Sequence, residues 1–153
     1  MQVSVLITTA GLEQALHSGD EAKMMQMIRA GADPDASGPN VFNALLHFAG
    51  RGDSEKVAEL VHLGADVNPQ EKDKWTPLMF ASFRGDIQNV IFLMNNGADL
   101  NMKNKNGHTA LDLATLEKHS AITEILKSYK TKNLRTNKNV RKFVLFTNIF
   151  RNN

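Results

Sequence analysis

The chain has 153 residues, 42% of them hydrophobic and 22% charged, a balance typical of one globular domain large enough to bury a core. It contains no cysteine, which excludes disulfides, thiol catalysis and cysteine-ligated zinc. The net charge of +2 is unevenly divided, because residues 1–129 hold all 16 acidic residues and carry −5, whereas residues 130–153 carry +7.

Residues 1–8 precede any repeating pattern and are interpreted as an N-terminal extension. Their apolar run, Val5 to Ile7, lacks a basic leading segment and is too short for the core of a signal peptide. No stretch reaches the roughly 20 apolar residues that span a bilayer, and no N-glycosylation acceptor is present. Together with the missing disulfides, these features predict an intracellular protein, cytoplasmic and/or nuclear.

Three sequence markers recur at intervals of 33 residues. The pair Gly-Asp begins at Gly19, Gly52 and Gly85, and the triplet Gly-Ala-Asp begins at Gly31, Gly64 and Gly97. A leucine keeps the same interval at Leu12, Leu45, Leu78 and Leu111. This common register divides residues 9–129 into four units, at about 9–36, 37–69, 70–102 and 103–129.

Each unit carries the signals of two short antiparallel helices and a turn, so the chain is expected to be all-α. In the unit 70–102, Thr76 is a suitable N-cap and Pro77 suits the first position of a helix. Gly85 and Asp86 then end this helix and begin the next. Gly97 ends the second helix, since a residue just past a helix C-terminus commonly adopts a left-handed conformation.

The segment 76–101 reads TPLMFASFRGDIQNVIFLMNNGADLN and resembles the ankyrin repeat, T-P-L-H-x-A-A-x-x-G-x-x-x-x-V-x-x-L-L-x-x-G-A-D-x-N. Residues 43–68 give a second full match, and residues 11–35 and 109–130 give shorter matches of the kind expected for capping repeats. The resemblance implies an ankyrin-repeat solenoid of four repeats, with paired antiparallel helices and projecting β-turns.

This sequence departs from the ankyrin pattern at its histidine, which is replaced by Leu46, Met79 and Asp112. In the family this histidine braces the turn with hydrogen bonds. We therefore expect these hydrogen bonds to be lost and the stack to have modest stability, strongest in the middle and unfolding locally from its ends.

No catalytic, cofactor or metal site is predicted, and the resemblance implies a binding protein that is not an enzyme. A phosphate-binding glycine loop is absent, and the five histidines lack metal-ligand spacing: His17, His47, His62, His108 and His119. No small-molecule substrate is expected.

Two Arg-Gly-Asp triplets, beginning at Arg51 and Arg84, match the peptide signature of integrin-binding proteins. Both coincide with the predicted turn between the two helices of a unit, where the aspartate would begin the second helix. We therefore interpret the triplets as part of the repeat and not as adhesion ligands.

Partner-binding residues are carried over from the positions that ankyrin repeats use, at the turn tips and the exposed side of the first helices. The predicted residues are Phe42, Trp75 and His108 before the first helices, Arg51, Phe83 and Arg84 near the helix ends, and Lys72 and Lys105 at the tips. They predict a groove with an aromatic ladder, Phe42–Trp75–Phe83, flanked by two arginines, the composition of binding hot spots. In the alternative interpretation, Phe42 and Trp75 only cover the stack.

The favoured function is that of a monomeric adaptor or inhibitor that binds another protein. The tail, residues 130–153, is basic and rich in phenylalanine, and leaves three interpretations open: a disordered arm for nucleic acid or acidic lipid, an amphipathic helix, or an extension without function. A further alternative is a regulatory or targeting fragment of a larger enzyme complex.

Overall fold

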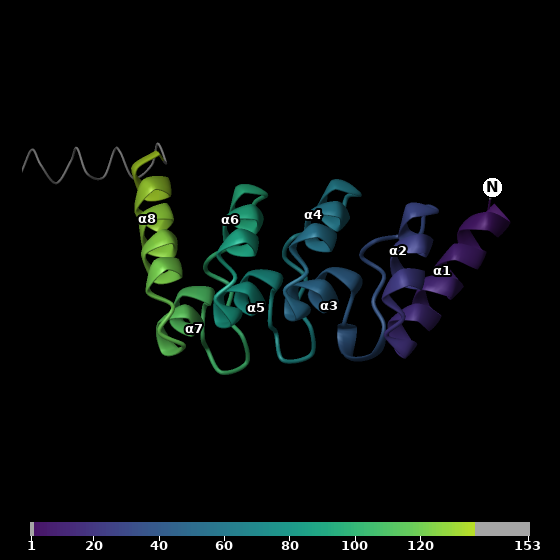
Figure 1. The fold of residues 1–153 in the computed structure, drawn as a ribbon, viewed down its shortest axis with the longest axis horizontal. Coiled ribbons are helices and arrows are strands. Elements are labelled where there is room, and N and C mark those ends of the chain that lie inside the picture. The colour runs from purple at the N-terminus through teal and green to yellow at the C-terminus, as the bar shows by residue number, and fades with distance from the viewer. Residues whose placement is uncertain (1, 137–153) are drawn as a thin grey trace, which may run out of the picture.

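The computed structural model describes residues 2–136, with side chains described for residues 8–132. These residues form four pairs of helices in one row (Figure 1). The first helices of the pairs are α1 (Gln2–Ser18), α3 (Ala44–Arg51), α5 (Pro77–Arg84) and α7 (Ala110–Leu116). The second helices are α2 (Glu21–Arg29), α4 (Ser54–His62), α6 (Ile87–Asn95) and α8 (Ser120–Thr136). The described chain contains no strand, and the predicted all-α solenoid is confirmed.

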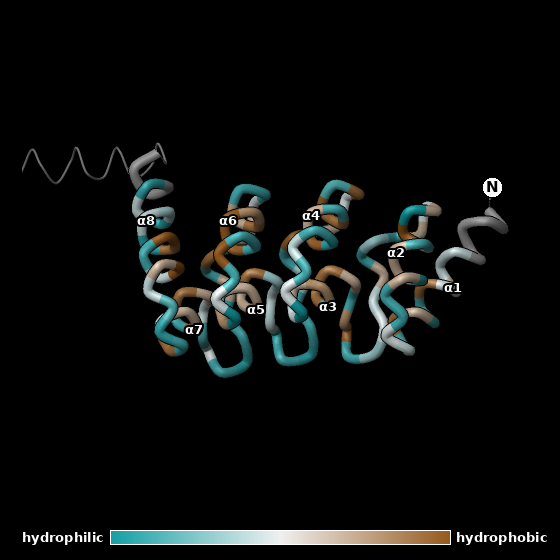
Figure 2. Tube along the Cα trace, viewed as in Figure 1, coloured by the Kyte–Doolittle hydropathy of each residue, from teal (hydrophilic) through white to brown (hydrophobic). Residues whose placement is uncertain are grey.

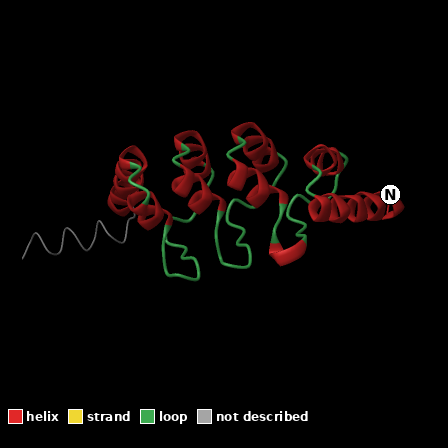
Figure 3. Ribbon diagram, turned by 60° about the horizontal axis from the view of Figure 1, so that its bottom comes forward, coloured by secondary structure: helices red, strands yellow, loops and turns green. Residues whose placement is uncertain are grey.

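The helix pairs lie in two layers with loops projecting from one side (Figures 1 and 3). The first helices contact one another along the row, α3 with α5 and α5 with α7, and the second helices do so through α4, α6 and α8. We call the projecting loops fingers, at residues 37–42, 70–75 and 103–108. The first finger contains the short 3-10 helix η1 (Pro39–Val41). In Figure 2 the other two fingers are hydrophilic.

The helix ends are formed by the residue types that the sequence indicated. Thr76 caps α5 by accepting a hydrogen bond from the Met79 amide at 3.2 Å. Gly85 follows α5 with φ 76°, a left-handed conformation that glycine adopts without strain. Asp86 then caps α6 by accepting from the Asn89 amide at 3.0 Å. The Gly-Asp pair is therefore the turn between helices, as predicted.

The core runs along the interface between the layers. Leu12, Leu45 and Leu78 of the predicted leucine series are buried at its centre, whereas Leu111 is half-buried. Leu46 and Met79, which replace the histidine of the ankyrin pattern, are also buried. The histidine positions of these two units have thus become part of the apolar core.

The turns of the third and fourth units are braced by residues other than the missing histidine. Glu71 accepts hydrogen bonds from the amides of Asp73 and Trp75, both at 2.9 Å. Asn104 accepts from the amides of Asn106 and His108, both at 3.0 Å. These bonds join residues inside each finger.

Asp112, the third replacement, forms a capping box with Thr109 at the start of α7. Its carboxylate accepts from the Thr109 amide at 2.8 Å and from the Thr109 hydroxyl at 2.7 Å. These two bonds lower the pKa of Asp112, the amide having the larger effect. The carboxylate is therefore held in its charged form at the beginning of a helix, where the dipole favours a negative charge.

The outer side of the fourth unit is polar. Met79 and Met94 of the third unit are buried, but their counterparts 33 residues later, Asp112 and Lys127, are exposed. No further helix pair of the described chain covers these positions. Charged side chains there leave little apolar surface at this end of the row.

Both terminal helices cross the boundaries that we placed at the ends of the repeats. α1 begins at Gln2, within the predicted extension 1–8, and α8 continues past residue 129 to Thr136. Residues 130–136 of the predicted tail are therefore helical. The rest of the tail, residues 137–153, lies outside the described residues.

Neighbouring fingers are joined by a repeated polar contact at their base. Asp35 accepts a hydrogen bond from the Asp66 amide at 2.9 Å, and Asn68, one repeat later, accepts from the Asp99 amide at 2.8 Å. Partial burial raises the pKa of Asp35; the bond from Asp66 opposes this rise, and repulsion from the charges of Asp33 and Asp66 adds to it. The same contact therefore costs more with a carboxylate than with an amide.

Asp35→Asn is expected to raise the free energy of unfolding at pH 7 by about 0.5 kcal/mol, a small gain because solvent screens this exposed site. The folded-state pKa of Asp35 is raised, so its ionised form destabilises the fold at neutral pH, and this penalty disappears as pH falls through the folded and unfolded pKa values. Urea denaturation at pH 7 and at about pH 4 measures the difference.

Asp99→Asn is the control, because Asp99 is an aspartate of the same kind of turn whose neighbours are uncharged. Its carboxylate accepts from the Asn101 amide and its own amide donates to Asn68, and both asparagines stand at positions equivalent to Asp35. We expect no gain from this control. An equal gain from Asp35→Asn at both pH values would contradict the electrostatic explanation.

Candidate protein-binding surface

An aromatic cluster lies where the second finger meets α5. The ring of Trp75 is half-buried, with ring centroids 5.1 Å from Phe80 and 5.5 Å from Phe83. Phe80 lies over Gly50 of the preceding unit, where an added Cβ would be 3.8 Å from its ring. Trp75 therefore supports the stack through Phe80, while Phe83 remains 42% exposed. The cluster thus has a packing side and a solvent side.

Phe42 belongs to a different cluster, so the rings do not form the single ladder that we predicted. Its ring centroid is 6.2 Å from that of His47, which in turn lies 5.1 Å from Phe48. Phe42 is half-buried. This arrangement agrees with the alternative interpretation for Phe42, in which the ring covers the stack.

The two arginines of the Arg-Gly-Asp triplets connect neighbouring repeats. Arg51 Nε lies 2.6 Å from Glu21 Oε1, and His47 Nε2 lies 2.9 Å from the same oxygen. Arg84 Nη1 donates to the Gly50 carbonyl at 3.1 Å. The guanidinium of Arg84 also covers Gly52, where an added Cβ would lie 3.0 Å from Nε. Both arginines therefore help to hold adjacent repeats together, although part of each side chain is exposed.

The aspartates of the same triplets are also occupied. Asp53 accepts from the Lys56 amide at 3.0 Å and forms an ion pair with the Lys56 ammonium at 2.6 Å. The hydrogen bond to the Lys56 side chain lowers the pKa of Asp53. Asp86 is likewise the N-cap of α6. In this fold the triplets therefore form the connection between the two helices of a unit.

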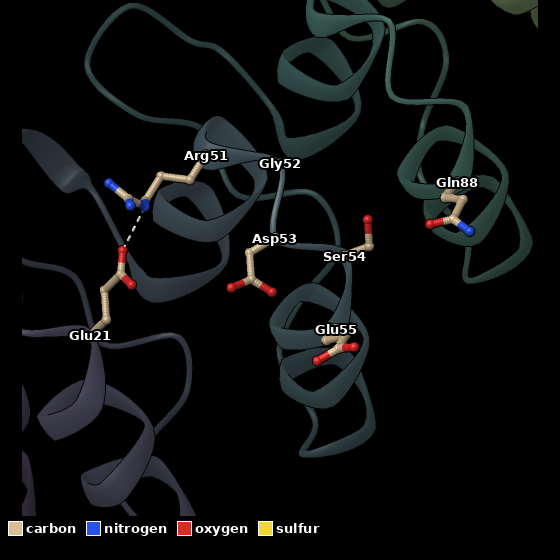
Figure 4. Close-up of a pocket in the computed structure, with 7 residues that line it drawn as sticks. All are labelled: Glu21, Arg51, Gly52, Asp53, Ser54, Glu55 and Gln88. Carbon is tan, nitrogen blue, oxygen red and sulfur yellow. Dashed lines mark ion pairs between the residues drawn. The ribbon is translucent and has the colours of Figure 1, made fainter.

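A cleft of about 500 Å³ opens beside the first triplet (Figure 4). Its lining residues come from the first three units: Glu21, Arg51, Gly52, Asp53, Ser54, Glu55 and Gln88. The Glu21–Arg51 ion pair lies at one side of it. Its charges are mixed, because two further carboxylates accompany this pair.

The predicted tip residues lie on the fingers, as expected. Lys72 and Lys105 are exposed, and Lys105 Nζ lies 3.1 Å from Asp73 Oδ1 of the neighbouring finger. Backbone hydrogen bonds also join the tips, from the Lys72 amide to Asn40 and from the Lys105 amide to Asp73, each 3.0 Å. His108 is half-buried, and its main chain is held by Asn104. The tips are therefore a connected surface rather than separate loops.

One apolar residue, Leu116, extends this surface beyond the predicted set, and a second, Phe80, packs against Trp75. Leu116 is 59% exposed and occupies the position of Phe83 in the next unit. The 33-residue interval points to this position from the sequence alone. Phe80 was missed because its position holds His47 and Leu113 in the neighbouring units, so the repeat gave no aromatic signal. We call one continuous set of residues the inner surface: Trp75, Phe83, Leu116 and the finger lysines Lys72, Lys74, Lys103 and Lys105.

Two other kinds of site are absent from the described residues. Histidine and acidic side chains form no group of three that could hold a metal ion within this part of the chain. No helix in the described segment has the length and apolar character needed to cross a membrane.

Comparisons with known proteins agree with the repeat pattern. A family model described as ankyrin repeats (3 copies) matches residues 12–104 and again residues 45–138. A comparison with curated proteins found no match. The two matched ranges together cover most of the sequence, including all four helix pairs at least in part. The chain therefore belongs to the ankyrin repeat family.

Proposed function

We propose that this protein is a non-enzymatic adaptor or inhibitor that acts inside the cell, as a monomer, by binding another protein through its inner surface. Ankyrin repeats are generally protein–protein interaction modules, and the family is typically without catalytic activity. The observation that carries the proposal is the exposure of Phe83 and Leu116 at equivalent positions of adjacent units, beside the half-buried Trp75.

The energetics favour this surface over an isolated exposed residue. Phe83 and Leu116 lie on the contacting helices α5 and α7, so one partner segment can cover both. Burying one such side chain is worth about 2 kcal/mol. Aromatic and arginine side chains near the centre of an interface commonly dominate its affinity, and Arg84 follows Phe83 directly.

Phe83→Ala is expected to weaken partner binding about tenfold or more, because the partner loses its main apolar contact. The measurement is quantitative affinity capture from cell extract, comparing the full-length protein with this variant. Ile91→Ala is a matched control: Ile91 is 43% exposed, close to the 42% of Phe83, but lies on α6 in the second layer. Thermal denaturation of each variant checks that the fold is retained.

Partners that depend on the inner surface would be retained by Ile91→Ala and lost by Phe83→Ala. Equal retention by both variants would contradict the proposal. The alternatives that rest on the basic tail, binding of nucleic acid or acidic lipid, concern mainly residues 137–153, which lie outside the described part of the chain. No contact of the described residues favours a regulatory fragment of an enzyme complex.

A further inference from the structure

Positive charge on the fingers is concentrated at one end of the row. The finger 37–42 contains no charged residue, whereas Lys72, Lys74 and Lys103 are exposed on or next to the other two fingers. No ion pair of the described residues involves these three lysines. The third and fourth units therefore present ammonium groups that are available to a partner.

The acidic groups nearby are already occupied. Both carboxylate oxygens of Glu71 accept backbone hydrogen bonds, and Asp73 pairs with Lys105. At the far ends of α5 and α7, Arg84 and Glu117 stand at equivalent positions, so their charges offset each other along the row. The lysines without an ion pair therefore lie on the finger side, where Lys103 also helps to lower the pKa of Asp112.

The apolar anchors lie in the same two units. Phe83 and Leu116 are exposed on α5 and α7, but the equivalent position on α3 is Gly50, which has no side chain. Phe80 lies across Gly50 and fills the space that a larger residue would need. Apolar anchors at this helix position and lysines without an ion pair thus coincide in the third and fourth units. In the second unit this position is Gly50, and the exposed apolar residues, Val41 and Leu63, lie elsewhere.

We propose that the partner is an acidic protein segment with apolar anchor residues, bound over the third and fourth units. This inference rests on the proposed function and specifies the chemistry of the partner. Its apolar side chains cover Phe83 and Leu116, and its carboxylates face Lys72, Lys74 and Lys103. Such complementarity raises the association rate and rejects basic partners. The protein's own tail, residues 137–153, is an unfavourable occupant because it is basic.

A random peptide library selected on the full-length protein tests this proposal without assuming a partner. The enriched sequences should contain more Asp and Glu than Lys and Arg, together with aromatic or leucine residues at helical or extended spacing. Trp75 is the single tryptophan of the chain, so its fluorescence reports binding of the selected peptides directly.

Replacing Lys72, Lys74 and Lys103 with Gln should lower the affinity for the selected peptides at least tenfold. The same change should reduce the salt dependence of binding. Replacing Lys127, Lys130 and Lys132 on α8 with Gln removes the same charge elsewhere and should leave binding unchanged.

The outcomes separate this inference from the proposed function. If the selected peptides are neutral or basic but bind the Phe83→Ala variant more weakly, the inference of an acidic partner is overturned. The proposed binding at the inner surface is then retained. If no peptide is enriched, or if enriched peptides bind Phe83→Ala equally well, both the inference and the proposed function are overturned.

Discussion

Phe48→Ala is expected to lower the free energy of unfolding by about 4 kcal/mol, more than any other substitution considered. Phe48 is completely buried and is among the largest side chains in the core. Its ring contacts His47 edge-on, and the Lys56 ammonium lies 5.3 Å from its centroid. Truncation removes these contacts and leaves a cavity between the second unit and its neighbours.

Urea denaturation followed by circular dichroism measures this loss. Phe48→Leu is the control, because it keeps most of the volume and should cost about 1–1.5 kcal/mol. The equivalent residues of the next two units are Ala81 and Ala114. A cost for Phe48→Ala below about 1 kcal/mol would mean that the second unit can close up like its neighbours, contrary to our expectation for a close-packed core.

Val41→Gly and Lys74→Gly are expected to stabilise the fold by about 1 kcal/mol each, and about 2 kcal/mol together. Val41 has φ 61° and Lys74 has φ 62°, a left-handed conformation that is costly for side chains with a Cβ and most of all for a β-branched one. Gly107 occupies the same position of the fourth unit with φ 80°. Val41 is 59% exposed, so its removal sacrifices little packing.

Gly107→Ala provides the reverse test of the same cause. A Cβ at Gly107 would meet nothing within 4 Å, so only backbone strain can act, and a loss of about 1 kcal/mol is expected. Thermal or urea denaturation of the three variants measures these differences. If Val41→Gly destabilised the protein, the side chain of Val41 would have to stabilise the first finger by more than the strain costs.

The parts of the fold that were predictable from sequence depend on local signals. Thr76, Gly85 and Asp86 act through residues within three or four positions, and the 33-residue interval repeats those signals in every unit. Backbone hydrogen bonds close to such residues follow from their chemistry alone. The order and pairing of the helices were therefore accessible without a structure.

Contacts between units were less accessible. Arg84 could have faced solvent, and only the structure shows its bond to the Gly50 carbonyl. The same holds for His119, whose ring covers Gly85 and lies 3.0 Å from the Phe83 carbonyl. These partners are more than 30 residues apart, and their choice depends on how adjacent units are stacked.

The candidate surface was predictable in outline for a related reason. Its positions follow from the repeat, but the division of the aromatic residues between covering the stack and facing solvent does not. Phe42 and Trp75 occupy equivalent positions, yet Phe42 contacts His47 and Trp75 contacts Phe80 and Phe83. The difference arises from the neighbour on the first helix, a small polar ring in one unit and two phenylalanines in the next.

The polar outer side of the fourth unit also bears on self-association. A row of similar units related by translation and rotation has no built-in end, so an apolar last unit would offer a template on which another copy could continue the row into a fibre. Asp112 and Lys127 replace two buried methionines at that boundary, and a copy docking there would have to dehydrate both charges. Polymerisation through this face of the fourth unit is thereby opposed by these two substitutions.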